Sequence, residues 1–298
     1  FNLPLLYLGT LIIGASIAIF NVLLPSMIQA NQPQKISLLT TLYVTAMGVS
    51  TAIASYLSVP ITQASSWKSL ILVLSFLCLV TLLVWLPNHR HNHHLENQKE
   101  KQVKENILKS KNVWAIIIFG GLQSLLFYTS MTWLPTIAIS AGLSNSDAAL
   151  LASIFSLISI PFSMTVPSLT TRLSDGHRQT MLAIISIAGM TGIAMLLYPS
   201  SNFLYWLVVH LLIGTACSAL FPYLMVCFSL KTSSPEKTAQ LSGLAQTGGY
   251  ILAAFGPTLF GYSFELFQSW IPAVLALLAV DIIMTVSLFM VDRADKIL

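Results

Sequence analysis

Charged residues are scarce in this chain. Only 8% of its 298 residues are Asp, Glu, Lys or Arg, whereas ordinary soluble domains carry about 25%. Apolar residues make up 55%. So few charges cannot cover the surface of a soluble protein of this length, so a lipid bilayer must form part of its surroundings. We interpret the net charge of +4 as a sign of membrane orientation rather than of nucleic-acid binding.

Cysteines and nucleotide-binding motifs are scarce as well. The three cysteines, Cys78, Cys217 and Cys227, lie in apolar runs without metal-ligand spacing, so we interpret them as small packing residues. No segment of the sequence resembles a phosphate-binding loop, which argues against ATP-driven pumping by this chain. We therefore expect no cofactor, no metal and no nucleic-acid partner.

Long apolar runs, in contrast, are abundant. A helix needs about 20 apolar residues to cross the hydrocarbon of a bilayer. The ten-residue alternating strands of closed barrels do not occur in the sequence. The pattern therefore predicts an all-α membrane protein with nine spans in this chain. Their approximate bounds are 4–29, 37–63, 67–87, 113–139, 146–171, 178–198, 202–229, 238–264 and 270–291.

The basic residues predict how these spans are oriented. Lys and Arg gather on the cytoplasmic side of membrane proteins. If the first span runs inward, 13 of the 14 basic residues fall on that side, and Lys68 is the exception. The sequence thus predicts a multi-pass protein of the cytoplasmic membrane, with the connection 88–112 and the C-terminus in the cytoplasm.

The connection 88–112 is the longest polar stretch, and it divides the chain unequally. We expect three spans of a first half in 1–87, a cytoplasmic loop in 88–112, and a complete six-span half in 113–298. The histidines at the start of the loop have two possible interpretations, metal binding or part of a solvated basic loop, and the composition favours the second. These histidines are His89, His91, His93 and His94.

A weak internal repeat relates the two parts. Residues 35–67 align with 237–270, and the alignment matches Trp67 with Trp270. The first three spans then correspond to the last three, and the counterparts of the middle three would precede Phe1. We expect a parent of twelve spans in two parallel six-span halves, with roughly 90 further residues upstream and a solute site between the halves.

Several sequence motifs occur in order along the chain. They are NVLLPS at 21–26, GLQSLLFY at 121–128, and LSGLAQTGGY at 241–250 followed by Gly256 and Pro257. Together they resemble the cyanate/2-nitroimidazole transporter family of the major facilitator superfamily, over nearly the whole chain. The resemblance implies a major facilitator fold, of which this chain holds nine of twelve helices, and secondary transport of a small polar or anionic solute.

One charged turn is similar to the superfamily's loop signature but departs from it. Of Gly-x-x-x-Asp-Arg-x-Gly-Arg-Arg, the chain keeps only Arg172, Asp175 and Arg178. This cluster either latches helix ends in one conformation or anchors the cytoplasmic side. Gly249 and Pro257 either provide a bend for alternating access or permit close helix packing.

Polar and aromatic side chains inside the spans are candidates for the solute path, because they tend to face the bundle or a water-filled cavity. Gln123, Phe127 and Ser130 share one helical stripe, with Tyr128 and Trp133 beside it.

A second pair of candidates, Gln246 and Tyr250, is four residues apart in a later span, and Asn21 and Tyr43 are weaker candidates. The resemblance places the spans of Gln123 and Gln246 beside the central cavity. Contact with the solute and hydrogen bonding between helices are both open for these glutamines.

Two ionisable side chains, His210 and Asp281, lie within membrane depth, at a similar predicted level. Such a pair could carry a coupling proton. Alternatively, Asp281 bonds a neighbouring Ser or Thr.

These observations favour a monomeric secondary transporter that works by alternating access, surrounded by lipid and binding a small-molecule solute. A membrane-embedded enzyme or a sensor is the alternative. An enzyme would need a convergent catalytic set at one depth, and a sensor would normally carry a soluble output domain. We therefore expect no enzymatic activity.

Overall fold

The computed structural model describes residues 3–87 and 107–298, and the regular structure within these ranges is helical. Its α-helices are α1 (Leu3–Asn31), α2 (Ile36–Ala64), α3 (Trp67–Trp85), α4 (Lys111–Ser140), α5 (Asn145–Leu157), α6 (Ser159–Arg172), α7 (Asp175–Met195), α8 (Phe203–Leu230), α9 (Pro235–Phe267) and α10 (Ile271–Arg293). Short 3₁₀ helices precede α2 (η1, Pro33–Lys35) and α4 (η3, Ile107–Lys109). The predicted all-α class is confirmed.

Each of the nine predicted spans coincides with helix, but one of them is interrupted. The span predicted at 146–171 consists of α5 and α6, which meet at Ile158. Pro161 explains the break. It has no N–H to donate to the carbonyl of Leu157, and its ring crowds that carbonyl. The two helices together cover the predicted span, and the segment Asn145–Arg172 is long and apolar enough to cross a membrane as one unit.

Seven segments within the described ranges are long and apolar enough to cross a membrane. They are Pro4–Asn31, Lys68–Trp85, Lys111–Ser140, Asn145–Arg172, Asp175–Met195, Phe203–Leu230 and Ile271–Arg293. Helix α9 is long but is not one of these seven segments. Apolar side chains such as Ile184, Ile187 and Ile283 point outward from α7 and α10. Apolar surface of this extent is typical of a lipid-facing protein.

The chain forms two compact units, and their boundary falls within α2. One unit contains residues 1–48 and 107–298, and the other contains residues 49–106. In the smaller unit, the apolar side chains of α3 are exposed along the helix. The predicted division at 87 and 112 stays a prediction, and the four histidines from 89 to 94 lie outside the described residues.

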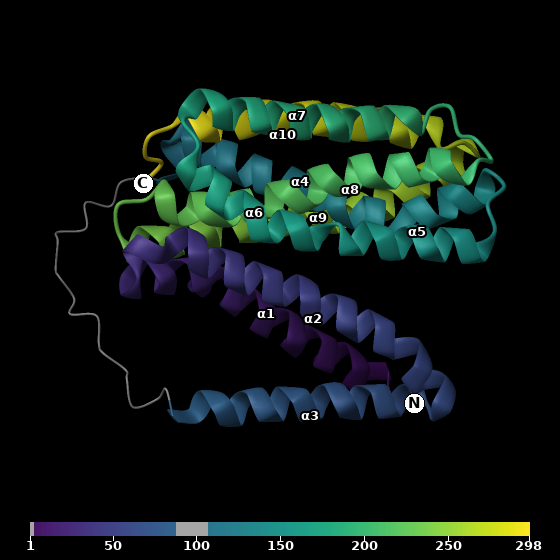
Figure 1. The fold of residues 1–298 in the computed structure, drawn as a ribbon, viewed down its shortest axis with the longest axis horizontal. Helices are drawn as coiled ribbons and strands as arrows, with labels where there is room; N and C mark the ends of the chain where they lie inside the picture. The colour runs from purple at the N-terminus through teal and green to yellow at the C-terminus, as the bar shows by residue number, and fades with distance from the viewer. Residues whose placement is uncertain (1–2, 88–106) are drawn as a thin grey trace. The chain divides into compact units, whose positions relative to one another are not determined.

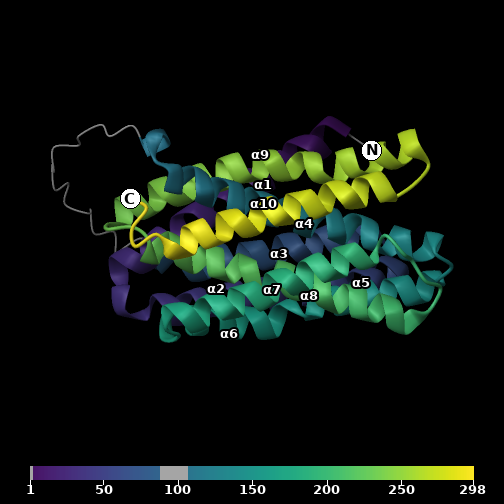
Figure 2. The ribbon, with the colours of Figure 1, turned by 90° about the horizontal axis from the view of Figure 1, so that it is seen from above.

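In the larger unit, α4, α7, α8, α9 and α10 run side by side along the long axis (Figures 1 and 2). Helix α8 lies deepest, with Trp206, Tyr223 and Phe228 fully buried. Helices α4 and α9 touch at two glycines. A Cβ added to Gly121 would lie 2.9 Å from the Cα atom of Gly249, which leaves no room for any side chain there.

Side-chain caps fix several helix starts. Ser144 Oγ accepts from Asp147 N at the start of α5, and Asn202 Oδ1 accepts from Leu204 N at the start of α8. Gly142 ends the turn after α4 with φ +105°, a left-handed conformation that glycine adopts without strain. These caps set the helix ends and hence the depth at which each polar side chain lies in the bundle.

Candidate functional site

Helix α1 packs against α8 and α9 near the end of the bundle that carries Lys35, Arg178, Lys231 and Arg293, which we call the basic end. The contact is made by hydrogen bonds from side chains to backbone carbonyls of the opposite helix. Ser26 Oγ donates to Pro235 O at 2.7 Å, and Ser242 Oγ donates to Val22 O at 2.8 Å. Gln29 Nε2 donates to Ser229 O at 3.1 Å, and Ser229 Oγ donates to Pro25 O at 3.1 Å. Thr238 joins the same network by donating to Gln29 Oε1.

The other half of α1 is different. Side chains from Leu5 to Phe20 are exposed almost without exception, whereas Asn21, Pro25 and Ile28 are buried. Within the described residues, α1 therefore closes onto α8 and α9 at the basic end and leaves its first half uncovered.

Five predicted path residues come together where α1, α2, α4 and α9 approach one another. Gln246 Nε2 donates to Asn21 O at 2.7 Å, and Asn21 Nδ2 lies 3.5 Å from Tyr250 Oη. The hydroxyl groups of Tyr43 and Tyr128 are near enough to interact electrostatically with that of Tyr250. We call these five residues the solute region.

The solute region is polar, uncharged and incompletely bonded. Tyr43 Oη, a donor, and Gln246 Oε1, an acceptor, are both buried and have no hydrogen-bond partner among the described residues. Tyr128 is 45% exposed, so the region is partly open. Buried polar groups are normally paired, so these two atoms are free to bond a small molecule that offers both an acceptor and a donor.

Gln123 lies elsewhere. Its side chain is 2% exposed and donates to Cys217 O on α8 at 2.9 Å. Here the amide makes the helix–helix hydrogen bond, one of the two interpretations left open by the sequence. Its stripe partners Phe127 and Ser130 also face the bundle, and Phe127 packs against Phe155 with ring centroids 6.1 Å apart. The structure thus separates this stripe from the solute region.

Trp133 and Pro257 meet near the end of the bundle opposite the basic end. Trp133 Nε1 donates to Pro257 O at 2.8 Å, and its ring packs against Phe260 and Trp270. The carbonyl of Pro257 thereby ties α9 to α4. Gly249, one of the residues proposed for a bend, shows close packing against Gly121.

At the basic end, Arg178 pairs with two acids. It lies 2.9 Å from Asp175 and 2.6 Å from Asp292, which is buried at the end of α10. Tyr223 Oη donates to Asp292 Oδ1 at 2.8 Å, and Lys231 Nζ donates to Asp292 O at 2.9 Å. The Arg178–Asp292 pair therefore ties α7 to α10.

Arg172, the third residue of that charged turn, is exposed. Sequence reasoning missed Asp292, although an acid at the inner end of the last span, beside Arg293, was a usable signal.

His210 and Asp281 do not form a pair in this structure. His210 is 1% exposed, with Nδ1 2.8 Å from Trp206 O and its ring against Phe155. Asp281 is equally buried but faces α8 at Cys217, seven residues from His210, which corresponds to about 10 Å along the helix. His210 Nε2 and both carboxylate oxygens of Asp281 have no hydrogen-bond partner among the described residues.

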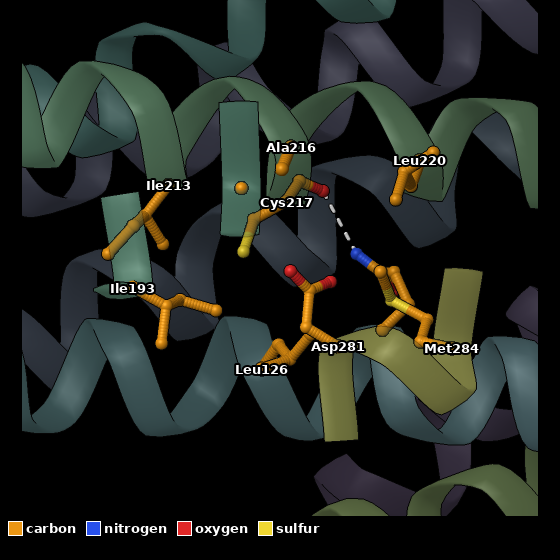
Figure 3. Close-up of a pocket in the computed structure, with 10 residues that line it drawn as sticks. Leu126, Ile193, Ile213, Ala216, Cys217, Leu220, Asp281 and Met284 are labelled. Atoms are coloured by element: carbon orange, nitrogen blue, oxygen red, sulfur yellow. Dashed lines mark hydrogen bonds between the residues drawn. The ribbon is translucent and has the colours of Figure 1, made fainter. Parts of the chain in front are cut away.

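The carboxylate of Asp281 points into a small cavity between α4, α7, α8 and α10, toward Cys217 (Figure 3). Its free volume is about 10 Å³, roughly that of a single water position. Most of the lining is apolar, from Leu126, Ile193 and Ile213 among others. Gln123 also lines this cavity, and its hydrogen bond to Cys217 O is the dashed line in Figure 3.

Comparison with known proteins places the chain among transporters. The Major Facilitator Superfamily profile matches residues 1–257. The uncharacterized transporter YycB of Bacillus subtilis is 35% identical over 283 residues, which cover 94% of this chain and 69% of that protein. The 2-nitroimidazole transporter of Escherichia coli is 29% identical over 284 residues, or 95% of this chain and 71% of that protein.

A solved structure shares the fold. The Escherichia coli fucose:proton symporter FucP superposes with a TM-score of 0.61 at 12% sequence identity, over 91% of this chain and 71% of that protein. At this identity the likeness concerns the fold alone.

Proposed function

Because the chain belongs to the major facilitator superfamily and is a multi-pass membrane protein, we propose that it is a secondary transporter of a small polar solute. Transport rather than catalysis is supported by the family and by the relatives, which are named as transporters. We propose that it works as a monomer in the cytoplasmic membrane and that the basic end faces the cytoplasm, as the distribution of Lys and Arg predicts.

The observation that carries the proposal is the solute region, where helices from both predicted halves meet. Asn21 and Tyr43 come from α1 and α2, whereas Tyr128, Gln246 and Tyr250 come from α4 and α9. A solute bound there touches both sides of the interface that has to open and close. Its affinity can therefore differ between the two conformations, which ligand-driven switching requires.

The chemistry of the region favours one solute class within the range that the sequence resemblance implies. Tyrosine rings offer flat faces, Tyr43 Oη offers a donor, and Gln246 Oε1 offers an acceptor. None of the five residues is charged. A neutral azole such as a nitroimidazole matches this set, because it has a flat ring, acceptor atoms and an N–H donor. A bare anion such as cyanate would be repelled by the unpaired oxygen of Gln246, which is an acceptor.

The contact of α1 with α8 and α9 at the basic end supports alternating access. Its hydrogen bonds use short side chains and backbone carbonyls. Water can replace such bonds at little net cost when the interface opens. We propose that this contact closes the cytoplasmic side in the conformation seen here, and that the exposed first half of α1 faces the path on the other side.

Counterflow in proteoliposomes tests this function. Vesicles loaded with a nitroimidazole should take up labelled nitroimidazole, and small anions should compete poorly. Tyr250→Phe should weaken the apparent affinity by about 3- to 10-fold, the size of one lost hydrogen bond. Tyr198→Phe is the matched control, because Tyr198 is 81% exposed at a loop.

Uptake of anions but not of azoles would show that the solute class is wrong. Equal effects of Tyr250→Phe and Tyr198→Phe would exclude the solute region as the binding site. A wild-type protein that is well folded and moves neither class of solute would contradict the function itself.

A further inference from the structure

Asp281 is an acidic side chain buried in the core of the bundle without a partner for its charge among the described residues. Its side chain belongs to α10, is 1% exposed, and has no partner for either oxygen among the described residues. Removing an ionised carboxylate from water without a partner is very unfavourable. An acid in such a place is therefore neutral, or it acquires a partner in another conformation.

The groups that face Asp281 offer no compensating charge. Helix α7 contributes Gly189, α4 contributes Gln123 and Leu126, and α8 contributes Cys217, the one other titratable group in the cavity lining. The alternative from the sequence, a bond to a neighbouring Ser or Thr, is not formed among the described residues. The hydroxyls of Ser186 on α7 and Thr285 on α10 are themselves buried without partners.

The contact between α7 and α10 separates Asp281 from the basic end. Arg178 faces Asp292 at that end, and Gly189 faces Asp281, so the two contacts are eleven positions apart on each helix (178 to 189 and 281 to 292). The layer between them includes Leu182 and Leu288, both fully buried. The same layer holds the buried hydroxyls of Ser186 and Thr285, so Asp281 is separated from the basic end by packed side chains, with no charged group between 178 and 189 on α7 or between 281 and 292 on α10.

The same cavity reaches a helix of the solute region. Gln123 lines the cavity and donates to Cys217 O, and five residues further along α4 lies Tyr128, beside Tyr250. A change in the charge of Asp281 alters the field at the Gln123 amide. The hydrogen bond of that amide to Cys217 O joins α8 to α4, the helix that carries Tyr128.

We propose that Asp281 is the binding site of a coupling proton, outside the solute region and linked to it through Gln123 and α4. This inference rests on the proposed transport function. One O–H bond forms on a carboxylate oxygen with a proton taken from water, and the carboxylate charge is neutralised. The same bond breaks when the other conformation gives the acid access to water on the opposite side. His210, two helical turns along α8 and away from the basic end, lies on the side from which a proton arrives.

Infrared spectroscopy of the full chain in proteoliposomes tests the site directly. A protonated carboxyl has a C=O stretching band that shifts in D₂O. We expect such a band in the wild-type protein, its loss in Asp281→Asn, and its retention in Glu265→Gln. Glu265 is the matched control, because it is an exposed acid in the neighbouring helix α9. The band should also change when solute is added.

Proton movement in the same vesicles tests coupling. A pH-sensitive dye inside the vesicles should report protons entering with solute in the wild type and in Glu265→Gln. Asp281→Asn should abolish this signal while solute counterflow continues, because exchange of bound solute needs no net proton transfer. If Asp281→Asn fails to fold, Cys217→Ser serves as a second variant, since a new hydroxyl beside the carboxyl should shift the band and leave the fold intact.

Two results would overturn the proposal. If no acid band disappears in Asp281→Asn, the carboxyl is ionised and holds no proton. If the band disappears but proton entry is unchanged, Asp281 is a structural acid. A wild-type protein that moves no solute would contradict the transport function instead. In that case the proton site at Asp281 would be tested by measuring the carboxyl band as a function of pH. A band whose intensity does not change with pH would show that Asp281 neither takes up nor releases a proton, which would exclude the site.

Discussion

Along the contact between α1 and α9, polar side chains donate to carbonyls of the opposite helix. Along the contact between α7 and α10, an ion pair at one end is followed by a layer of uncharged buried side chains and then by an acid without a hydrogen-bond partner among the described residues. The first contact is satisfied by many bonds of similar strength, so it can open stepwise. The second contact is held by one ion pair, Arg178–Asp292, and contains at its other end Asp281, the acid that we propose binds a proton. In the proposed mechanism, the polar residues of the first contact belong to a surface that opens and closes, and Asp281 at the second contact binds a proton.

The largest effect that sharpens this comparison is expected from Arg178→Ala. The side chain of Asp292 is fully buried, and removing Arg178 leaves its carboxylate with the Tyr223 hydroxyl as its hydrogen-bond donor and with Lys231 nearby; breaking a buried ion pair typically destabilises a protein by about 3–5 kcal/mol. Thermal unfolding in detergent measures the loss. Arg172→Ala, at an exposed position six residues earlier, should change stability by less than about 0.5 kcal/mol. Equal losses in both variants would show that the pair does not hold α7 to α10.

A smaller effect of the opposite sign is expected from Asp281→Leu. The acid has no hydrogen-bond partner among the described residues, and its cavity is lined by apolar groups. Replacing it by an apolar side chain of similar volume should raise the free energy of unfolding by about 1 kcal/mol. The gain in stability should accompany the loss of proton entry. A large destabilisation would instead mean that Asp281 has a structural partner that this conformation does not show.

The smallest effect is expected from Ser242→Ala. Ser242 Oγ donates to Val22 O at 2.8 Å across the α1–α9 contact. Losing this bond should destabilise the closed conformation by about 1 kcal/mol. Accessibility of a cysteine placed at the basic end, measured by labelling from the cytoplasmic side, should therefore rise. Ser16→Ala is the matched control, because Ser16 is exposed and bonds within its own helix. No difference between these two variants would argue against this contact as the gate.

The positions of the helices were predictable because the hydrocarbon of a bilayer offers no hydrogen-bond partners to the backbone. A run of about 20 apolar residues without water must satisfy its own N–H and C=O groups, and a helix does so locally. All nine predicted positions are helical for that reason. The break between α5 and α6 lies at Ile158, three residues before Pro161, a residue type that can interrupt helical hydrogen bonding. A proline interrupts, kinks or is tolerated in a membrane helix according to what neighbouring helices supply.

The candidate site was predicted in part. Polar groups within membrane spans tend to face the interior of the bundle, and on this ground the sequence predicts four candidates that the structure brings together: Asn21, Tyr43, Gln246 and Tyr250. Gln123 was grouped with them for the same reason, yet it bonds α8. Periodicity identifies residues that share a face of one helix, but it does not say which neighbour that face meets.

The sequence by itself determined the class of the protein, the positions of its helices and, through the family motifs, its superfamily. These follow from local properties: apolar length, backbone hydrogen bonding and the order of motifs. The tertiary structure alone decided that His210 and Asp281 are apart, that Asp292 pairs with Arg178, and that Gln123 shares a cavity with Asp281. Such contacts depend on the rotation and register of packed helices, which arise from side-chain packing between segments far apart in the chain.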